Sequence, residues 1–341
     1  MKTTQKIDFV VPWVDSSDPE WIKLYNYYRP EKPISDRGRF RNWEIFRYWF
    51  RAVEQYAPWV NKVYLITNGT FPTWINSECP KLVMIRHEDY IPMQFLPTFN
   101  SHTIELNMDK IPGLSEHFVY FNDDVFLNAP TKQEDYFVDG LPCDNNAEKI
   151  FINPWYDPVD RFNVGIVRYC DIAVINRYFD RRMTVRQAPM KWLGSHLWNK
   201  SFFPTLLMSL LGAGGFESFQ LPHREQPFLK SVLQEIWTKE TEMLVASCTR
   251  FRQDVSLNQY VFRYWQFASN KFHPVRYNTG KVISLSESSA EEACRLISEG
   301  KIRSICLNDS PCCQEEAFLS IEKKLIETFE RKFPKKSGFE K

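Results

Sequence analysis

The sequence predicts an α/β protein in which helices flank a mainly parallel sheet and a largely helical insert interrupts the chain. Three observations favour this fold. Short apolar runs alternate with amphipathic helical segments in the first third of the chain, as in βαβ units. Three predicted strands end in acidic side chains, and a strand–helix–strand pattern returns after residue 280. The 341 residues suffice for one large domain with insertions or for two joined lobes.

Composition excludes some classes of protein. Hydrophobic residues make up 43% of the chain, and the formal net charge is +1, which argues against nucleic-acid binding through the overall field. The eight cysteines form no Cys-x-x-Cys motif, so we expect buried free thiols in a reducing cytosol. The N-terminus lacks a signal-peptide pattern, and no apolar run could span a bilayer. We therefore expect a cytoplasmic protein.

The first predicted strand covers residues 7–14 and ends in a polar loop. Ligands of α/β sheets bind beyond the carboxyl ends of the strands, so Asp15 and Asp18 are candidates for contact with a nucleotide. An Asx-type turn followed by a helix that begins near Pro19 explains the same residues.

The next segments predict βαβ units. They cover a helix at residues 43–56 and strands at 62–67 and 82–86. The second strand ends in the turn Asn68-Gly69. Before the helix, Arg39 and Arg41 carry planar guanidinium groups that suit phosphate recognition, although a solvated basic loop is equally simple. Further along, Asn100 or Ser101 can cap a short helix.

The central motif is the run FVYFNDDVF at residues 118–126. A buried strand breaks into Asn122, Asp123 and Asp124 and then resumes as apolar residues. Two carboxylates and a carboxamide at a strand end supply the oxygen ligands that Mg²⁺ prefers. Ordinary turn chemistry is the alternative. The acidic and asparagine-rich residues 143–149 are predicted to form an exposed loop.

The second half is less regular. Residues 162–179 are predicted to form a strand and then a helix, and residues 256–270 an aromatic helix in the core. The apolar stretch 190–216 fits core helices or a membrane-surface segment. His223 lies in a loop before a predicted helix at 227–237. Arg252 follows a helix that ends near Ser247, and a surface pair with Asp254 is its alternative role.

The C-terminal part is predicted to return to the sheet. Strands at residues 281–285 and 303–307 enclose a helix that a Ser288–Glu291 capping box begins and Gly300 ends. The second strand ends at Asn308-Asp309, and a helix follows from Ser310 to about Lys332. Residues 334–341 are predicted to be a flexible tail.

Four stretches resemble successive motifs of the Stealth family. They read IDFVVPWVDSSDP, RFRNWEIFRYWFRAVEQYAPWVNKVYLITNG, LPTFNSHTIE and IPGLSEHFVYFNDDVF. Shorter counterparts follow in order at Leu221-Pro222-His223, at Arg250-Phe251-Arg252 with Asp254, and at Cys306-Leu307-Asn308-Asp309. Many relatives carry glycine where this chain has Ser16 and aspartate where it has Asn68. The family comprises bacterial capsular or exopolysaccharide phosphotransferases and the eukaryotic N-acetylglucosamine-1-phosphotransferase.

The resemblance implies a glycosyltransferase-A-like fold and a sugar-1-phosphate transferase. Such an enzyme passes a hexose-1-phosphate, here an N-acetylhexosamine-1-phosphate, from a UDP-hexose to a hydroxyl of a glycan or lipid-linked oligosaccharide and releases UMP. It would use Mg²⁺ or Mn²⁺ and could touch the inner face of the cell membrane as a peripheral protein. An ordinary glycosyltransferase that releases UDP, a polyol-phosphate transferase and a non-catalytic glycan-binding module are the alternatives.

The resemblance also assigns roles to residues. Asp123, Asp124 and Asp309 would hold the metal, and His223, Asp123 and Arg252 would be catalytic, with His223 as the general base. The donor and its phosphates would be bound by Asp15, Asp18, Arg39, Arg41, Asn68, Asn100, Asn122 and Asn308, assisted by Arg252. The expected division is a catalytic part at 1–150, a helical acceptor region at 151–275, a completing catalytic part at 276–333 and the tail.

Overall fold

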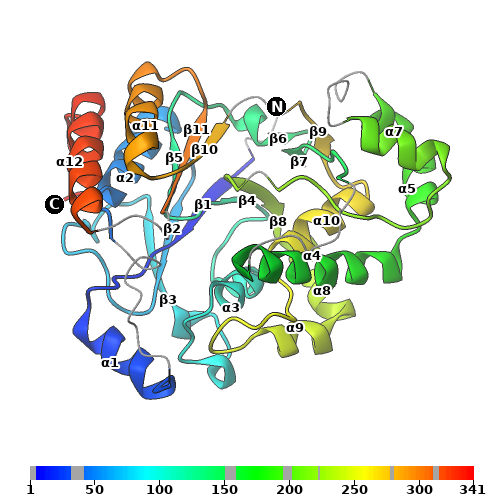
Figure 1. Cartoon of the computed structure of the whole chain (residues 1–341), viewed down its shortest axis with the longest axis horizontal. Coiled ribbons are helices and arrows are strands. Elements are labelled where there is room, and N and C mark those ends of the chain that lie inside the picture. The colour runs from blue at the N-terminus through cyan, green and yellow to red at the C-terminus, as the bar shows by residue number, and fades with distance from the viewer. Residues whose placement is uncertain are drawn as a thin grey trace.

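A five-stranded sheet forms the centre of the computed structural model, which describes residues 5–31, 42–149, 159–194, 202–221, 223–276, 280–309 and 315–341. The strand order is β3-β2-β1-β4-β8 (Figure 1). Its first four strands are parallel, and β8 is antiparallel to β4. The strands are β1 (Ile7–Pro12), β2 (Val63–Thr67), β3 (Leu82–Arg86), β4 (His117–Tyr120) and β8 (Gln226–Leu229). The predicted mainly parallel sheet is confirmed, in the 3-2-1-4 order of nucleotide-binding sheets.

Burial on both faces explains why β1 and β2 read as continuous apolar runs. Phe9, Val10 and Val11 in β1 are fully buried, as are Leu65 and Ile66 in β2. Helices must therefore cover both sides of the sheet, as in parallel sheets generally. The helices of the N- and C-terminal parts are α1 (Pro19–Tyr28), α2 (Phe46–Tyr56), α3 (Ser101–Leu106), α11 (Glu287–Glu299) and α12 (Glu315–Lys332).

The middle of the chain is mainly helical and lies on the other side of the sheet from α11 and α12 (Figure 1). Its helices are α4 (Val159–Tyr178), α5 (Arg181–Gln187), α6 (Pro189–Leu193), α7 (Phe202–Leu210), α8 (Lys230–Lys239), α9 (Thr241–Ser247) and α10 (Tyr260–Ala268). Short 3-10 turns occur at His87–Asp89, Met93–Phe95, Met108–Lys110 and Gln133–Asp135. Every residue of α10 after Tyr260 is buried, so the predicted aromatic core helix is confirmed.

Two small sheets complete the architecture. One has the order β10-β11-β5, and the other has the order β6-β7-β9. Their strands are β5 (Val125–Leu127), β6 (Phe137–Val138), β7 (Leu141–Asp144), β9 (His273–Pro274), β10 (Gly280–Ser284) and β11 (Ser304–Asn308). The C-terminal strands do return to the N-terminal part of the chain. They pair with β5, however, and leave the central sheet unchanged.

Three local predictions were wrong. Residues 162–179 contain no strand, because α4 runs unbroken through them. The predicted helix at 227–237 begins only at Lys230, since its first residues form β8, which is buried throughout against β4. The capping box of α11 is formed by Ser286 and Ser289 instead of Ser288 and Glu291, and Gly300 ends the helix in the left-handed conformation as predicted.

Residues 143–149 do not form the predicted exposed loop. Cys143 to Glu148 are buried, and their carboxylates are paired. The Arg263 guanidinium donates to both Asp144 oxygens at 2.7 and 3.0 Å, and Arg181 donates to both Glu148 oxygens at 2.6 Å. Bidentate ion pairs allow acidic side chains to be buried, so composition alone misplaced this segment.

The buried Arg263–Asp144 pair gives a stability prediction. Arg263→Ala should lower the free energy of unfolding by about 3–5 kcal/mol, because it strands a buried carboxylate. Chemical denaturation monitored by circular dichroism measures this loss. The control is Arg295→Ala, which removes an exposed contact to Glu299 and should cost less than about 1 kcal/mol. Equal losses in the two variants would show that the buried pair does not anchor α10.

The last eight residues also differ from the predicted flexible tail. Phe339 and Glu340 are buried. Arg51 in α2 donates to both carboxylate oxygens of Glu340 at 2.8 and 2.9 Å, and Glu340 forms an isolated bridge with Ile75. The charged composition of this segment suggested fraying. Instead, the buried Phe339 and the Arg51–Glu340 ion pair attach the segment to the rest of the protein.

Two further features concern the described part of the chain. Its six cysteines are free thiols, as predicted, but only Cys143, Cys248 and Cys306 are buried. None of its helices has the length and apolar character needed to traverse a bilayer.

Candidate active site

A cleft of about 620 Å³ opens where the central strands end. The carboxyl ends of the parallel strands share one edge of the sheet. Because β8 is antiparallel to β4, with Gln226 opposite Tyr120, the residues just before β8 reach the same edge. The cleft therefore collects side chains from segments that are distant in the sequence. Its volume is typical of sites for small molecules and cofactors.

The acidic end of the cleft joins two predicted strand termini. Asn122, Asp123 and Asp124 follow β4, whereas Asn308 and Asp309 end β11, and all five line the cleft. The two segments are held by the antiparallel pairing of β11 with β5 and by the Leu307 amide, which donates to the Asp124 carbonyl at 2.8 Å. The sequence predicted each terminus separately, and the fold places them side by side.

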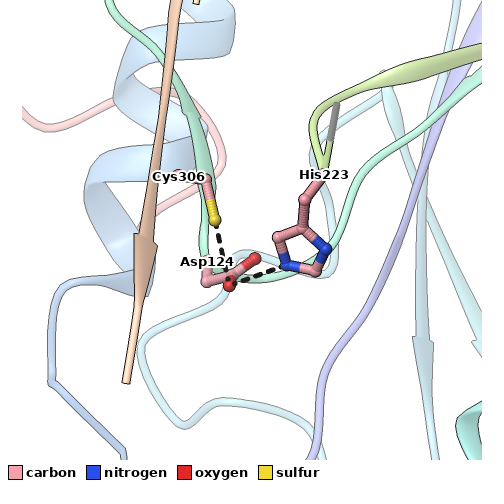
Figure 2. Close-up of side chains that lie close together, drawn as sticks. All are labelled: Asp124, His223 and Cys306. Atoms are coloured by element: carbon pink, nitrogen blue, oxygen red, sulfur yellow. Dashed lines mark hydrogen bonds and ion pairs between the residues drawn. The ribbon is translucent and has the colours of Figure 1, made fainter. Parts of the chain in front are cut away.

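Asp124 has one engaged and one unengaged carboxylate oxygen (Figure 2). Its Oδ2 lies 3.4 Å from His223 Nε2 and accepts a hydrogen bond from the Cys306 thiol at 3.3 Å. Its Oδ1 is buried and accepts no hydrogen bond from any described residue. A buried acceptor without a partner is costly, so the site fits a cation at Oδ1.

Asp123 reinforces this electrostatic picture. Burial, together with the adjacent Asp124 carboxylate, raises the pKa of Asp123 to about 7, although the side chain is open to the cleft itself. Two neighbouring carboxylates repel each other when both are ionised. A divalent cation offsets that repulsion, and oxygen ligands suit Mg²⁺ or Mn²⁺.

His223 lies in a strained backbone position just before β8. Its φ of 42° is in the left-handed region, which non-glycine residues adopt uncommonly. The Asp124 carboxylate raises the pKa of the imidazole through their contact. His223 also lines the cleft, so it can hold a proton beside the acidic end.

Two arginines bring positive charge to the cleft lining. Arg252 donates from Nη2 to Ser101 Oγ at 2.5 Å, which fixes one side of its guanidinium group. Arg168 in α4 also lines the cleft, and its buried Nε donates to no described residue. Sequence reasoning missed Arg168, because nothing in the pattern of the helical insert distinguishes a residue that faces the sheet.

Sequence reasoning also missed Glu105. This α3 residue is 6% exposed and lines the cleft. It accepts a hydrogen bond from the Tyr120 hydroxyl at 3.2 Å, and burial raises its pKa to about 7. Its position within the motif LPTFNSHTIE was the available signal.

Four predicted donor-binding residues are absent from the described residues that line the cleft: Asp15, Asp18, Asn68 and Asn100. Asp15 closes a local turn by accepting from the Ser17 amide at 2.9 Å. Asp18 caps α1 and accepts from the Thr70 hydroxyl at 2.6 Å, which lowers the Asp18 pKa. Both therefore have structural roles at the edge of the site.

Asn100 and Asn68 have other surroundings than the cleft lining. Asn100 is buried, caps α3 through the His102 amide and donates to the Thr249 carbonyl at 3.2 Å. It thereby connects α3 to the segment that leads to Arg252. Asn68 Oδ1 is buried and accepts no hydrogen bond from the described chain. Arg39 and Arg41 lie outside the described residues.

Together, the sheet and its cleft define an α/β protein whose strand ends carry an acidic site that fits a divalent cation. Two family descriptions match the sequence: "Stealth protein CR1, conserved region 1" over residues 5–33 and "Stealth protein CR2, conserved region 2" over residues 39–143. The chain belongs to the Stealth family, as its full-length relatives also show.

Three relatives are similar over nearly their whole length. The capsular polysaccharide phosphotransferase WcwK of Streptococcus pneumoniae is 36% identical over 100% of both chains. The exopolysaccharide phosphotransferase cps2G of Lactiplantibacillus plantarum is 37% identical and covers 98% of this chain and 96% of its own. The receptor polysaccharide phosphotransferase WefC of Streptococcus oralis is 35% identical, with 98% and 99% covered. The relatives are thus named phosphotransferases of surface polysaccharides.

Among solved structures, the galactosyltransferase LgtC in complex with donor and acceptor sugar analogues aligns with 95% of each chain. The TM-score is 0.38 and the identity is 7%. A similarity at this level carries no argument about the fold or the chemistry of this chain.

Proposed function

We propose that this protein transfers a hexose-1-phosphate, with N-acetylhexosamine-1-phosphate as the first candidate, from a UDP-sugar to a glycan hydroxyl. The product is a phosphodiester and the leaving group is UMP. The observation that supports this most strongly is the convergence of Asp123, Asp124, Asp309, His223 and Arg252 on one cleft in a chain whose relatives are polysaccharide phosphotransferases. The acceptor is a glycan or a lipid-linked oligosaccharide.

The acidic end of the cleft would hold the cation. Asp123, Asp124 and Asp309 offer carboxylate oxygens there, and the buried Asp124 Oδ1 supports direct ligation. When bound, Mg²⁺ or Mn²⁺ offsets negative charge on the diphosphate. Asn122 and Asn308 lie beside these carboxylates along the cleft, and their amide groups can donate hydrogen bonds to phosphate oxygens.

His223 would act as the general base. The acceptor oxygen attacks the phosphorus that carries the sugar, its proton passes to the imidazole, and the bond from that phosphorus to the bridging oxygen breaks. UMP leaves with the bridging oxygen. Asp124 holds Nε2 at 3.4 Å, so it orients the ring and stabilises the imidazolium that forms. Phosphoryl transfer depends mainly on such positioning and on offsetting charge.

Aromatic side chains form part of the cleft lining. Trp13, Trp43, Phe46 and Phe99 are among its lining residues. Trp13 and Phe46 stack with an interplanar angle of 3°. Flat apolar faces suit the uracil base or one face of a sugar ring.

Arg252→Ala should weaken donor binding about 10- to 100-fold, because a hydrogen bond to a charged group contributes roughly 1.5–3 kcal/mol. Arg252→Lys should recover only part of the loss, since lysine keeps the charge but lacks the planar fork. Titration calorimetry with UDP-N-acetylhexosamine and Mg²⁺ measures the affinity. Arg331→Ala, at an exposed position in α12 outside the cleft lining, is the control and should bind normally.

The proposed reaction is tested with a UDP-hexose that carries ³²P in the phosphate next to the sugar. Phosphotransfer moves the label to the acceptor glycan together with the sugar. Glycosyl transfer leaves the label in the released nucleotide, and this result would contradict the proposal. A protein that binds the glycan but leaves the labelled donor intact, with Mg²⁺ present, would instead be a binding module.

A further inference from the structure

We propose that Asp124, His223 and Cys306 form a second metal site, for a thiophilic divalent cation such as Zn²⁺, and that its occupation silences the enzyme. The three side chains come from different segments and point toward one another (Figure 2). Each offers one ligand atom, and the three atoms lie within 4.8 Å of one another. The silencing rests on the proposed function, whereas the binding of the cation does not.

The distances match those between ligands of a tetrahedral zinc ion. With Zn–N, Zn–O and Zn–S bonds of about 2.0–2.3 Å, neighbouring ligand atoms lie about 3.4–3.6 Å apart. Asp124 Oδ2 lies 3.4 Å from His223 Nε2 and 3.3 Å from Cys306 Sγ. To bind one zinc ion, the two distances from Asp124 Oδ2 need to change by only a few tenths of an ångström. His223 Nε2 and Cys306 Sγ, which lie within 4.8 Å of each other, must also move closer together.

The fold holds two of the three ligands rigidly. Cys306 is fully buried in β11 and pairs with Val125, the residue after Asp124, across the β11–β5 ladder. The His223 side chain is 42% exposed, so there is room for its ring to turn toward the sulfur atom. Asp124 and His223 line the cleft, so three protein ligands would leave a fourth position open on the cleft side, as in zinc sites that exchange a water molecule.

The chemistry of this ligand set differs from that of the acidic end. Mg²⁺ takes oxygen ligands, whereas imidazole and thiolate ligands select Zn²⁺ and similar ions. Without such an ion, burial and the Asp124 carboxylate raise the pKa of the Cys306 thiol. The thiol therefore keeps its proton and donates a hydrogen bond to Asp124. A coordinating cation reverses this preference. The thiol proton is released to the buffer when the Zn–S bond forms.

The proposed zinc site shares Asp124 with the proposed magnesium site and takes His223 from its role as general base. Coordination would draw Asp124 Oδ2 to the thiophilic ion and occupy the nitrogen of His223 that faces it. His223 could then no longer take the acceptor proton in the geometry described above. Zn²⁺ would therefore stop phosphotransfer by taking up His223, and a zinc-selective chelator added in the presence of excess Mg²⁺ should restore activity.

Binding is tested with Co²⁺ as a spectroscopic substitute for Zn²⁺, on the full-length protein without Mg²⁺. We expect one equivalent of Co²⁺ to give a thiolate-to-cobalt charge-transfer band and intense visible bands of tetrahedral cobalt, both abolished by Zn²⁺. Cys306→Ser should remove the charge-transfer band and weaken binding more than about 100-fold, beyond the loss typical of an outer-shell partner. Cys248→Ser alters another buried cysteine outside the cleft lining and should leave both bands unchanged.

His223→Ala keeps the test decisive if Cys306→Ser fails to fold. It should retain the charge-transfer band but require at least about tenfold more Co²⁺. An unchanged spectrum in Cys306→Ser, or no band in the wild type, would overturn the site. In the transferase assay, Zn²⁺ should inhibit the wild type at a concentration at least about tenfold lower than it inhibits Cys306→Ser. If the wild type released no UMP, the proposed function would fail while the cobalt spectra still decided the metal site.

Discussion

Asp124→Asn should lower the transfer rate about 1000-fold, because a metal-binding carboxylate contributes several kcal/mol to the stabilisation of the transition state. The variant keeps the size of the side chain, but it removes the charge and replaces one acceptor oxygen by an NH2 group, which can only donate. The substitution tests the role of the buried Asp124 Oδ1, which accepts no hydrogen bond from the described residues and is the proposed metal ligand. Turnover of a UDP-hexose with Mg²⁺ and an acceptor glycan fragment measures the effect.

The same substitution elsewhere provides the control. Asp139 is exposed, lies outside the cleft lining and has a φ of 51°, a conformation that asparagine tolerates well. Asp139→Asn should therefore keep full activity. Both variants should retain the circular dichroism spectrum and the melting temperature of the wild type within a few degrees. Near-normal turnover of a folded Asp124→Asn protein would refute the assignment of Asp124 to the metal.

His223→Ala should slow the chemical step about 100- to 10,000-fold, the range that general acid–base groups contribute. Donor affinity should change little, because the imidazole would touch the acceptor hydroxyl rather than the nucleotide. Single-turnover rates measure the chemical step, and titration calorimetry measures donor binding. A fall in affinity with an unchanged single-turnover rate would show that His223 binds the donor and is not the base.

A second histidine serves as the comparison. His273 lies in β9, is partly exposed and does not line the cleft, so His273→Ala should keep both the rate and the affinity. His223→Gln tests whether a hydrogen bond to Asp124 is sufficient. Because glutamine cannot accept the proton as imidazole does, this variant should be as slow as His223→Ala.

The sequence predicted the elements whose burial is visible in their own run of residues. β1, β2 and β3 are apolar runs of five or six residues, and the Asn-Asp-Asp break after β4 marked the acidic end of the cleft. α10 was readable because its aromatic residues recur through a short segment that is buried on all sides. Local pattern carries this information, since hydrophobic periodicity reflects burial within one element.

Long-range pairing was not readable. The short β8 contains a proline, and only its pairing with β4 brings His223 beside Asp124. Cys306 lies beside Asp124 because of the β11–β5 register. Asp144 can be buried because it pairs with Arg263, which lies 119 positions further along the chain. Such contacts depend on tertiary packing, which propensity and periodicity do not encode.

The central claim is attack at phosphorus, and the identity of the released nucleotide tests it most directly. The purified protein would be incubated with a UDP-hexose, Mg²⁺ and a fragment of the acceptor glycan, and the nucleotides would be separated by chromatography. We expect UMP in an amount equal to the new phosphodiester, and neither product with Asp124→Asn. Release of UDP with a new glycosidic bond would show instead that this cleft attacks the sugar carbon, and the role given to His223 would have to be replaced.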